Sequence, residues 1–431
     1  MWKERLVALG RTVFVPPRTR DERNIYFLSV EIIFVALLSA AGSFNSAYIL
    51  RSGGSNALVG LLSSLPSLVA TFLFIPAAGF LERRQRQFPW IVGSLFVTRM
   101  GYAVIFLLPF FLRRYVPELT VAILVLMTVP AVLFSTGWSP LMSDVIPMRS
   151  RATVLAWRSI LSSMTIAPFI YLAGRWLDSV AFPLNYQLMY AAGFVAGADS
   201  CYLISRIEVP AKEAAPASAI SKPNEPWLSS LWSTLRENPR FVRIVVNTLM
   251  FDLGAWLVGP LYVIFFVRQL GATDGWLGLN GTLSHIGVIV GYWLWRRIIR
   301  HLGDARTLWV SLPLACIYPF MVALVPKLTF ILFAGFLVNV TSPGVGLSHG
   351  MMFLEMLPEG KKYSSTAIYS TVMNIGAFVG PLIGVAASDR IGIIPVLLIG
   401  GTLRVAGALL FYIFPIKELP AKQRAADGVP G

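Results

Sequence analysis

A few charged side chains interrupt long apolar runs, and they are the first candidates for chemistry. Glu31 and Asp252 are carboxylates inside such runs, and Arg99 and Arg404 are guanidinium groups inside others. A charge at the centre of a membrane-embedded helix costs roughly 3 kcal/mol on insertion scales, so each one needs a partner or a task. Because burial favours the protonated form of a carboxyl group, the two acids are candidates to bind and release a proton.

Other kinds of site find no support in the sequence. It contains no GxxxxGK[ST] loop to hold nucleotide phosphates, and its two cysteines, Cys201 and Cys316, form no cluster with histidine at metal-ligand spacing. We interpret both cysteines as packing residues. His285 is the only histidine that we place well inside a span, and we favour a structural hydrogen bond there over a proton relay. We predict no cofactor, no metal and no enzymatic activity.

The composition predicts a membrane protein. Hydrophobic residues make up 56% of the 431 residues and charged residues only 13%, which does not fit a soluble domain. Apolar runs of about 20 residues cross roughly 30 Å of hydrocarbon, and twelve such runs can be counted. The expected spans are 25–50, 57–81, 90–112, 119–143, 153–177, 186–205, 241–267, 276–295, 307–325, 330–357, 364–387 and 391–414.

The net charge of +15 reflects membrane topology rather than nucleic-acid binding. Most lysines and arginines fall in segments that share one side of the membrane if the spans alternate in direction. Because cytoplasmic segments carry such an excess, both termini are predicted to be cytoplasmic.

Two internal echoes predict a duplicated architecture. At a constant offset of 211 residues, Asp144 falls on Glu355 and Arg151 on Lys362. At an offset of 218, "RSGGSNALVGLL" (51–62) parallels "QLGATDGWLGLN" (269–280). A repeat of about half the chain, built from apolar spans, is typical of transporters with two related halves.

We therefore predict an all-α polytopic membrane protein with twelve helices in two pseudo-symmetric six-helix halves. The expected segments are a cytoplasmic N-terminal segment (1–24), an N-terminal bundle (25–206), a cytoplasmic linker (207–240), a C-terminal bundle (241–415) and a cytoplasmic tail (416–431). Within the linker, Trp227 to Glu237 has an apolar helical stripe, which suits the membrane surface or the protein's own cytoplasmic loops.

These features resemble the major facilitator superfamily, which shares six plus six spans and a hinge of the form D-x-x-P-x-x-x-R after span 4, here from Asp144 to Arg151. A family motif resembling G-x-x-x-D-R-x-G-R-R is matched in part, with Glu82 at the acid and Arg83 at the first arginine. The second half has Arg300 where that acid belongs. The resemblance implies a cytoplasmic gate of ion pairs, in which Arg158 would join Asp144 or Glu82. The gate candidates are Glu82, Arg83, Asp144, Arg151, Arg158, Glu355 and Lys362.

In that family spans 1, 4, 7 and 10 line the central cavity, so the resemblance implies ion coupling at Glu31 and Asp252, although Glu31 could instead face inner-leaflet water. Arg99 and Arg404 lie on peripheral spans and should pair with acids, Asp199 being one candidate for Arg99. Gly376, Gly380 and Gly384 resemble an antiporter motif, but we favour helix packing. The substrate-cavity candidates are Asn45, Ser135, Trp138, Tyr262, Asn339 and Ser342.

The resemblance implies a secondary active transporter that works by alternating access and is coupled to a proton. The scarcity of charge in the cavity favours a neutral or amphipathic, drug-like organic solute. We expect a monomer in the bilayer of a bacterial inner membrane, with no nucleic-acid partner. The alternative is a non-transporting protein of the same fold, an assembly factor or a sensor that handles a lipid or a pigment.

Overall fold

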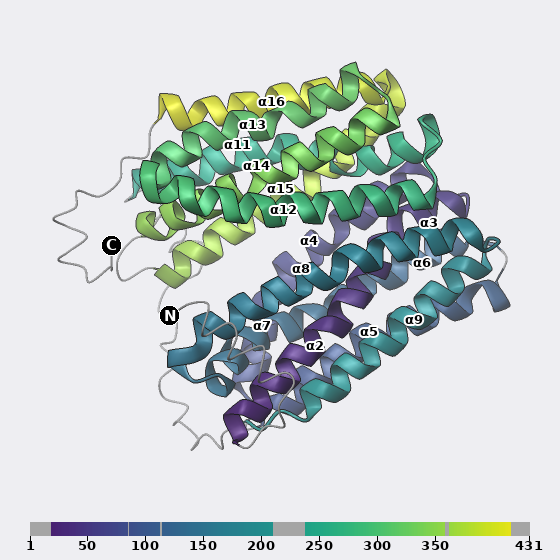
Figure 1. Cartoon of the computed structure of the whole chain (residues 1–431), viewed down its shortest axis with the longest axis vertical. Helices are drawn as coiled ribbons and strands as arrows, with labels where there is room; N and C mark the ends of the chain where they lie inside the picture. Colours follow the sequence, from purple (N-terminus) through teal and green to yellow (C-terminus); the bar gives the residue numbers. More distant parts are fainter. Residues whose placement is uncertain (1–18, 85, 113, 210–237, 358–361, 415–431) are drawn as a thin grey trace. The chain divides into compact units, whose positions relative to one another are not determined.

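The computed structural model describes residues 19–84, 86–112, 114–209, 238–357 and 362–414, and these residues form helices joined by short connections (Figure 1). The N-terminal amphipathic piece, the linker stripe from Trp227 to Glu237 and the basic tail, all expected from the sequence, lie outside the described residues.

Each predicted span corresponds to a helix or to two consecutive helices. The first six spans are α2 (Arg20–Gly42), α3 (Asn45–Arg51), α4 (Asn56–Glu82), α5 (Phe88–Phe111), α6 (Val116–Leu126), α7 (Thr128–Val145), α8 (Met148–Ser179) and α9 (Leu184–Ser205). The second six are α11 (Pro239–Ile264) with the π-helical turn η2 (Phe265–Gln269), α12 (Asp274–Leu302), α13 (Asp304–Leu324), α14 (Leu328–Met356), α15 (Lys362–Ile391) and α16 (Ile393–Ile413). Eleven spans in the described residues are long and apolar enough to cross a membrane, and α12 is the more polar twelfth.

Two predicted spans are broken in the structure. Span 1 is divided between α2 and α3 at Ser43, whose hydroxyl donates to the Ser39 carbonyl at 2.9 Å. Span 4 is divided between α6 and α7 at Met127. Pro130 has no N–H to donate to the Leu126 carbonyl, and this missing hydrogen bond accounts for the second break.

The described residues form two compact units. The first unit contains residues 19–209 and 266–285, and the second contains residues 238–265 and 286–414, so α12 contributes to both. Figure 1 shows the helices of each unit running side by side, with α2, α5, α8 and α9 in the first and α11, α13 and α16 in the second.

In the first unit, α2 packs against both α8 and α9, while α5 packs against α7 and α9. One apolar cluster, around Leu28, Val154 and Ile204, lies near the α2 N-terminus. A second, around Tyr48 and Tyr190, lies near α3. Because lipid tails are as apolar as these side chains, the packing is stabilised mainly by van der Waals contact.

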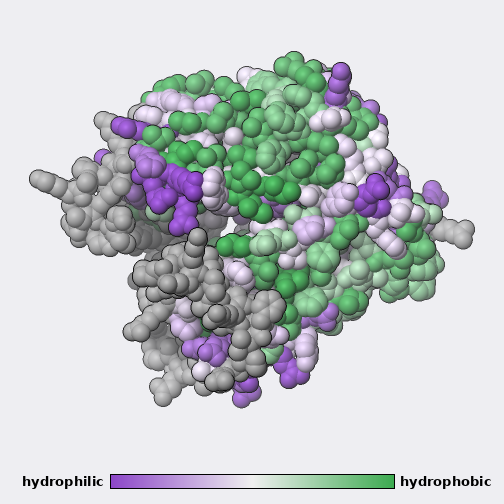
Figure 2. Space-filling model, in the orientation of Figure 1, coloured by the Kyte–Doolittle hydropathy of each residue, from purple (hydrophilic) through white to green (hydrophobic). Residues whose placement is uncertain are grey.

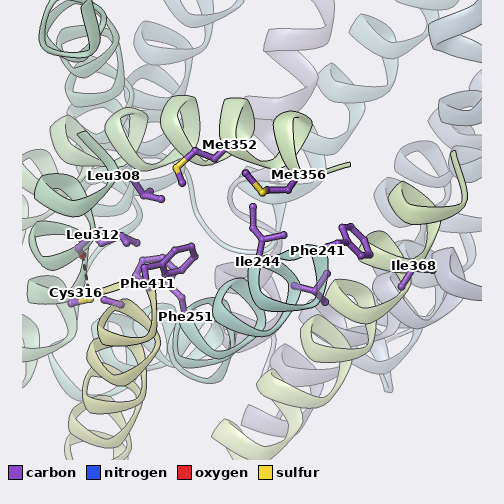
Figure 3. Close-up of a cluster of buried hydrophobic side chains, with 13 residues drawn as sticks. Phe241, Ile244, Phe251, Leu308, Leu312, Cys316, Met352, Met356, Ile368 and Phe411 are labelled. Carbon is purple, nitrogen blue, oxygen red and sulfur yellow. Dashed lines mark hydrogen bonds between the residues drawn. The ribbon is translucent and has the colours of Figure 1, made fainter. Parts of the chain in front are cut away.

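In the second unit, α11 packs against α15 and α16, and α13 packs against α14 and α16. Figure 3 shows Met352 and Met356 of α14 in the same apolar cluster as Phe411. Close approach of α11 and α15 depends on glycine, since a Cβ at Gly384 would lie 1.8 Å from the Leu257 carbonyl oxygen. The contact supports the packing interpretation of the glycine set.

The surface of the helices is apolar, as lipid contact requires. On the face drawn in Figure 2, hydrophobic residues cover long central stretches of the helices, and strongly hydrophilic residues lie mostly near helix ends. Large side chains such as Phe72 and Phe111 are 70% and 80% exposed. Such exposure would be unfavourable in water but suits a hydrocarbon environment.

Candidate functional site

The polar centre of the first unit is an ion pair between Glu31 of α2 and Arg158 of α8. The Arg158 Nη2 donates to Glu31 Oε2 at 2.8 Å, and Ser200 of α9 donates its hydroxyl to Glu31 Oε1 at 2.9 Å. Only 3% of the Glu31 side chain and 9% of the Arg158 side chain are exposed. Both carboxylate oxygens are therefore satisfied, and one acid ties three helices together.

Two further contacts enclose the Arg158 guanidinium. It donates to the backbone carbonyl of Leu28, and it lies over the ring of Trp138 at 5.4 Å from the ring centroid. The sequence analysis expected Arg158 to join Asp144 or Glu82, but Arg158 forms its ion pair with Glu31. The reason is geometric, because Arg158 lies nearly three turns inside α8 and faces α2.

Arg99 of α5 lies near enough to Glu31 for their charges to interact. Gly197 of α9 leaves room for it, since a Cβ there would lie 2.9 Å from Arg99 Cδ. Asp199 is exposed, and among the described residues no ion pair joins it to Arg99. The expected pairing of Arg99 with Asp199 is therefore wrong, because Asp199 lies on another face of α9 than Gly197.

The acid on the first helix of the second unit, Asp252, has fewer direct contacts with charged groups than Glu31. Asp252 of α11 is half-buried, and Arg404 of α16 is near enough for their charges to interact. The described part of this unit contains no direct ion pair between them. The Arg404 guanidinium instead lies over the Phe251 ring, 4.5 Å from its centroid. Arg404 is thus near an acid of a neighbouring helix, as expected, but it does not enclose that acid.

A second polar group lies one helical turn from Asp252. The Thr248 hydroxyl and His349 Nε2 of α14 share a hydrogen bond of 2.7 Å. Tyr369 of α15 lies near both Thr248 and Asp252, and its ring is 6.3 Å from the His349 ring. A titratable acid, an imidazole, a hydroxyl and a phenol therefore meet within the second unit, and we call Thr248, Asp252, His349, Tyr369 and Arg404 the α11 polar site.

The first-unit cavity candidates lie in different surroundings. Asn45 accepts a hydrogen bond of 2.9 Å from the hydroxyl of Tyr190, which belongs to the apolar cluster near α3. Trp138 lies beside Phe134 and under Arg158. Ser135 is exposed and donates to its own helix at Val132 O. Asn45 and Trp138 thus have protein partners, whereas Ser135 presents an accessible hydroxyl.

The second-unit cavity candidates likewise divide into two kinds. Tyr262 packs against Tyr318 of α13, with ring centroids 4.9 Å apart. Asn339 donates to Gly335 O at 2.8 Å, and the exposed Ser342 donates to Asn339 O. Tyr262 is also near enough to Arg404 of the α11 polar site for an electrostatic interaction, whereas Asn339 and Ser342 bond to carbonyls of their own helix. A substrate role for these residues stays a prediction.

The gate candidates lie at matching helix ends in the two units. Asp144 is one residue from the end of α7, and Glu355 is one residue from the end of α14. Arg151 lies in the first turn of α8, and Lys362 is the first residue of α15, with its side chain outside the described part. Glu82 ends α4 and is exposed, as is the following Arg83. The positions agree with the 211-residue repeat, and a gating role stays a prediction.

At the opposite end of the first unit, two arginines make reciprocal contacts. Arg51 donates to Ala272 O at 2.7 Å, and its Nε lies 3.5 Å from Asp274 Oδ1. Arg268 donates to Asn56 Oδ1 at 2.7 Å and to the carbonyl of Gly54. The 218-residue offset maps Gly54 onto Ala272 and Asn56 onto Asp274. Each arginine therefore binds the loop equivalent to the loop the other binds, and we call this arrangement the arginine clasp.

Close packing of α8 on α12 accompanies the arginine clasp. A Cβ at Gly174 would lie 2.6 Å from Asp274 O, and one at Gly278 would lie 2.7 Å from Ile170 O. Thr282 also donates its hydroxyl to Ala167 O of α8 at 2.8 Å. Only glycine at these positions permits the contact, which brings Asp274 beside the end of α3.

The sequence analysis missed two of these features. The arginine clasp was signalled by the second echo, which contains Arg51 and Asp274, but we used the echo only as evidence of duplication. His349 was missed because we took His285 as the only histidine well inside a span, whereas His349 also lies within α14. No sequence pattern linked it to Thr248, which is 101 residues away.

Comparisons with known proteins agree with this architecture. Residues 244–430 match the family described as the Major Facilitator Superfamily. A bacterial homolog of the human lysosomal transporter Spinster, inward-facing and occupied, superposes with a TM-score of 0.66 at 12% identity, covering 94% of this chain and 100% of the other. A bacterial homologue of the iron transporter ferroportin, inward-facing, gives 0.69 at 12% identity, covering 91% and 98%. The nucleoside transporter NupG, as a point mutant, gives 0.63 at 13% identity, covering 90% and 100%.

No curated protein matches the chain by sequence. In the described residues, the helices, their order and the structural matches define a polytopic membrane protein with twelve spans. The chain has the major facilitator fold, and its second half matches the model of that family. The predicted fold class and the resemblance inferred from the sequence are therefore confirmed.

Proposed function

We propose that the chain is a secondary active transporter that moves a small organic solute by alternating access, coupled to a proton at Asp252. The fold supports the transporter class, since the structures it matches are described as transporters or as homologues of transporters. One observation carries the coupling proposal: Asp252 interacts electrostatically with Arg404 but forms no direct ion pair within the described second unit.

The surroundings of the two acids favour Asp252 over Glu31 as the proton carrier. Protonating Glu31 would leave Arg158 as a buried cation without its partner, and breaking a buried pair in this way typically costs about 3–5 kcal/mol. Asp252 can take up a proton without depriving a cation of a direct ion-pair partner, since none is paired directly with it in the described second unit. The neighbouring Thr248–His349 pair offers a route for proton exchange or an anchor for a polar group of the solute.

The chemistry of the candidate cavity residues favours a neutral or amphipathic solute. Asn45, Ser135, Asn339 and Ser342 provide hydrogen-bonding groups, and Trp138 and Tyr262 provide aromatic faces. The matched structures are described as handling different cargoes, so the fold does not select a substrate. We place both termini on the cytoplasmic side of a bacterial inner membrane, on the basis of the basic residues, with Glu82, Asp144 and Glu355 in the cytoplasmic gate.

Purified protein in proteoliposomes tests this function. Solutes that raise the melting temperature in a ligand screen would be added outside vesicles that contain a pH-sensitive dye. We expect a hit compound to drive proton movement with the wild-type protein. Asp252→Asn should abolish proton movement while retaining exchange of the solute between the two sides.

The matched control is Asp389→Asn, which replaces an acid near the C-terminal end of α15 and should leave coupling intact. Absence of transport with every compound that binds would contradict the transporter function and favour a sensor or assembly role. Proton movement that persists in Asp252→Asn would contradict only the assignment of the coupling residue.

A further inference from the structure

The first unit contains an apolar groove that the proposed transport cycle does not use. Helices α8 and α9 both pack along α2 but hardly contact each other, so a hollow of about 690 Å³ remains between them. Small residues of α2 and α9, including Ala40, Ala41 and Ala196, form its floor. Its volume falls within the range of about 300–1,000 Å³ that is usual for small-molecule sites.

One charged residue, Asp199 of α9, lies among the residues that line this groove. The next residue, Ser200, faces the interior and bonds Glu31, so successive positions of α9 point to different sides. Asp199 lies six residues before the end of α9 at Ser205, which places it about 9 Å from that end at 1.5 Å per residue. Its carboxylate is therefore on the groove side, at a depth where charge is costly.

No protein cation offsets this charge in the groove. None of its lining residues is a lysine or an arginine, and Asp199 makes no ion pair with any other described residue. Trp176 also lines the groove, but its indole N–H donates to Asn185 O at 3.3 Å and not to Asp199. A carboxylate among apolar walls without a partner creates a strong local preference for a positive charge.

We propose that this groove binds a lipophilic cation, a compound with one positive charge on an apolar body. The Asp199 carboxylate pairs with the charge, and the aromatic and aliphatic walls, such as Phe169, Leu172 and Trp176, bury the body. A neutral lipid would leave the carboxylate unpaired, and an anion would be repelled. The site lies wholly within the first unit, so the inference is independent of coupling at Asp252 and of transport itself.

Binding of radiolabelled tetraphenylphosphonium to the full chain in zwitterionic nanodiscs tests the proposal, with no gradient applied. We expect Asp199→Asn to weaken binding at least tenfold, because it removes the charge and keeps the shape. Ala192→Phe should weaken binding by a similar factor, because it fills the groove from an exposed position and leaves Asp199 in place. The matched control, Glu118→Gln, removes an exposed acid of α6 outside the groove and should bind like the wild type.

Several outcomes would overturn the proposal. Equal affinity in Asp199→Asn and wild type would show that the carboxylate does not recognise the probe. Loss of binding in Asp252→Asn with retention in both groove variants would place the cation in the second unit. A co-purified phospholipid detected by native mass spectrometry, displaced by Ala192→Phe but indifferent to Asp199→Asn, would make the groove a lipid site. Melting temperatures of the groove variants are measured as a control, and values equal to that of the wild type exclude unfolding as the cause of weaker binding, which then supports the proposal.

Discussion

The two units of the molecule place an acid on the first helix of each half, but they treat that acid in opposite ways. In the first unit Glu31 is buried and both of its oxygens are satisfied by Arg158 and Ser200. In the second unit Asp252 is half-buried, and Arg404 stacks on Phe251 without a direct bond to the acid. The first acid is suited to holding helices together, and the second is suited to changing its protonation state.

An acid on the first helix of each half can therefore have a different role in each half. The sequence analysis assigned the same coupling role to both acids because both lie on cavity-lining spans of the family. What distinguishes them is the partner supplied by other helices, since Arg158 forms a direct ion pair with Glu31, whereas Arg404 interacts with Asp252 at longer range and lies over Phe251. The comparison can be tested by changing residues of the two units one at a time.

The largest effect is expected from Arg158→Met. This change leaves Glu31 buried without a cation, and the free energy of unfolding should fall by about 3–5 kcal/mol. Adding Glu31→Gln should recover much of the loss, because a neutral side chain no longer needs the guanidinium. Thermal or denaturant unfolding in detergent would measure both. A double variant as unstable as the single one would show that the ion pair itself is not what stabilises the first unit.

The second unit should instead be most sensitive at its glycine contact. Gly384→Ala would place a Cβ 1.8 Å from the Leu257 carbonyl oxygen, which is closer than van der Waals contact allows, so α15 must move away from α11. We expect a loss of about 1–3 kcal/mol in unfolding free energy, the usual cost of overpacking. Gly346→Ala is the matched control, because a Cβ there meets nothing within 4 Å. Equal effects of both changes would refute the packing interpretation.

The arginine clasp offers a smaller and more discriminating comparison. Arg51→Gln removes the cation beside Asp274, whose side chain is only 7% exposed, and should cost about 1–2 kcal/mol. Arg268→Gln removes a donor to the neutral Asn56 and should cost less, about 0.5–1 kcal/mol. Unfolding free energies of the two variants measured side by side give the answer. A reversed order would show that the carboxylate of Asp274 does not depend on Arg51.

The smallest effect on stability is expected from Asp252→Asn, with the largest contrast in function. Because no direct ion pair is lost, the free energy of unfolding should change by about 1 kcal/mol or less. Solute-driven proton movement should disappear at every pH tested, since the side-chain amide does not titrate and so cannot bind and release a proton as the carboxylate does. Proteoliposome flux at several external pH values would measure this. A loss of stability comparable to that of Arg158→Met would mean that Asp252 is as structural as Glu31.

Much of the architecture followed from sequence pattern alone. The predicted span 57–81 and the observed α4 (Asn56–Glu82) differ by one residue at each end, because apolar length and polar boundaries are local properties. The breaks in spans 1 and 4 were missed, since Ser43 and Pro130 lie inside apolar runs that hydropathy treats as continuous. The site was less accessible, because Arg158, Thr248 and His349 acquire their partners from helices about a hundred or more residues away.

Apolar length, charge placement and internal repeats are local features of the chain, and they were enough to predict a duplicated bundle of membrane helices. The sequence also identified Glu31 and Asp252 as the acids that need an explanation. The packing of the helices was needed to see that Glu31 is bound by Arg158 and Ser200, that Asp252 has no such direct ion pair in the described second unit, and that Asp199 lines an apolar groove. The physical reason is that helix rotation and packing choose which side chains meet, and a single-helix pattern does not specify the partner.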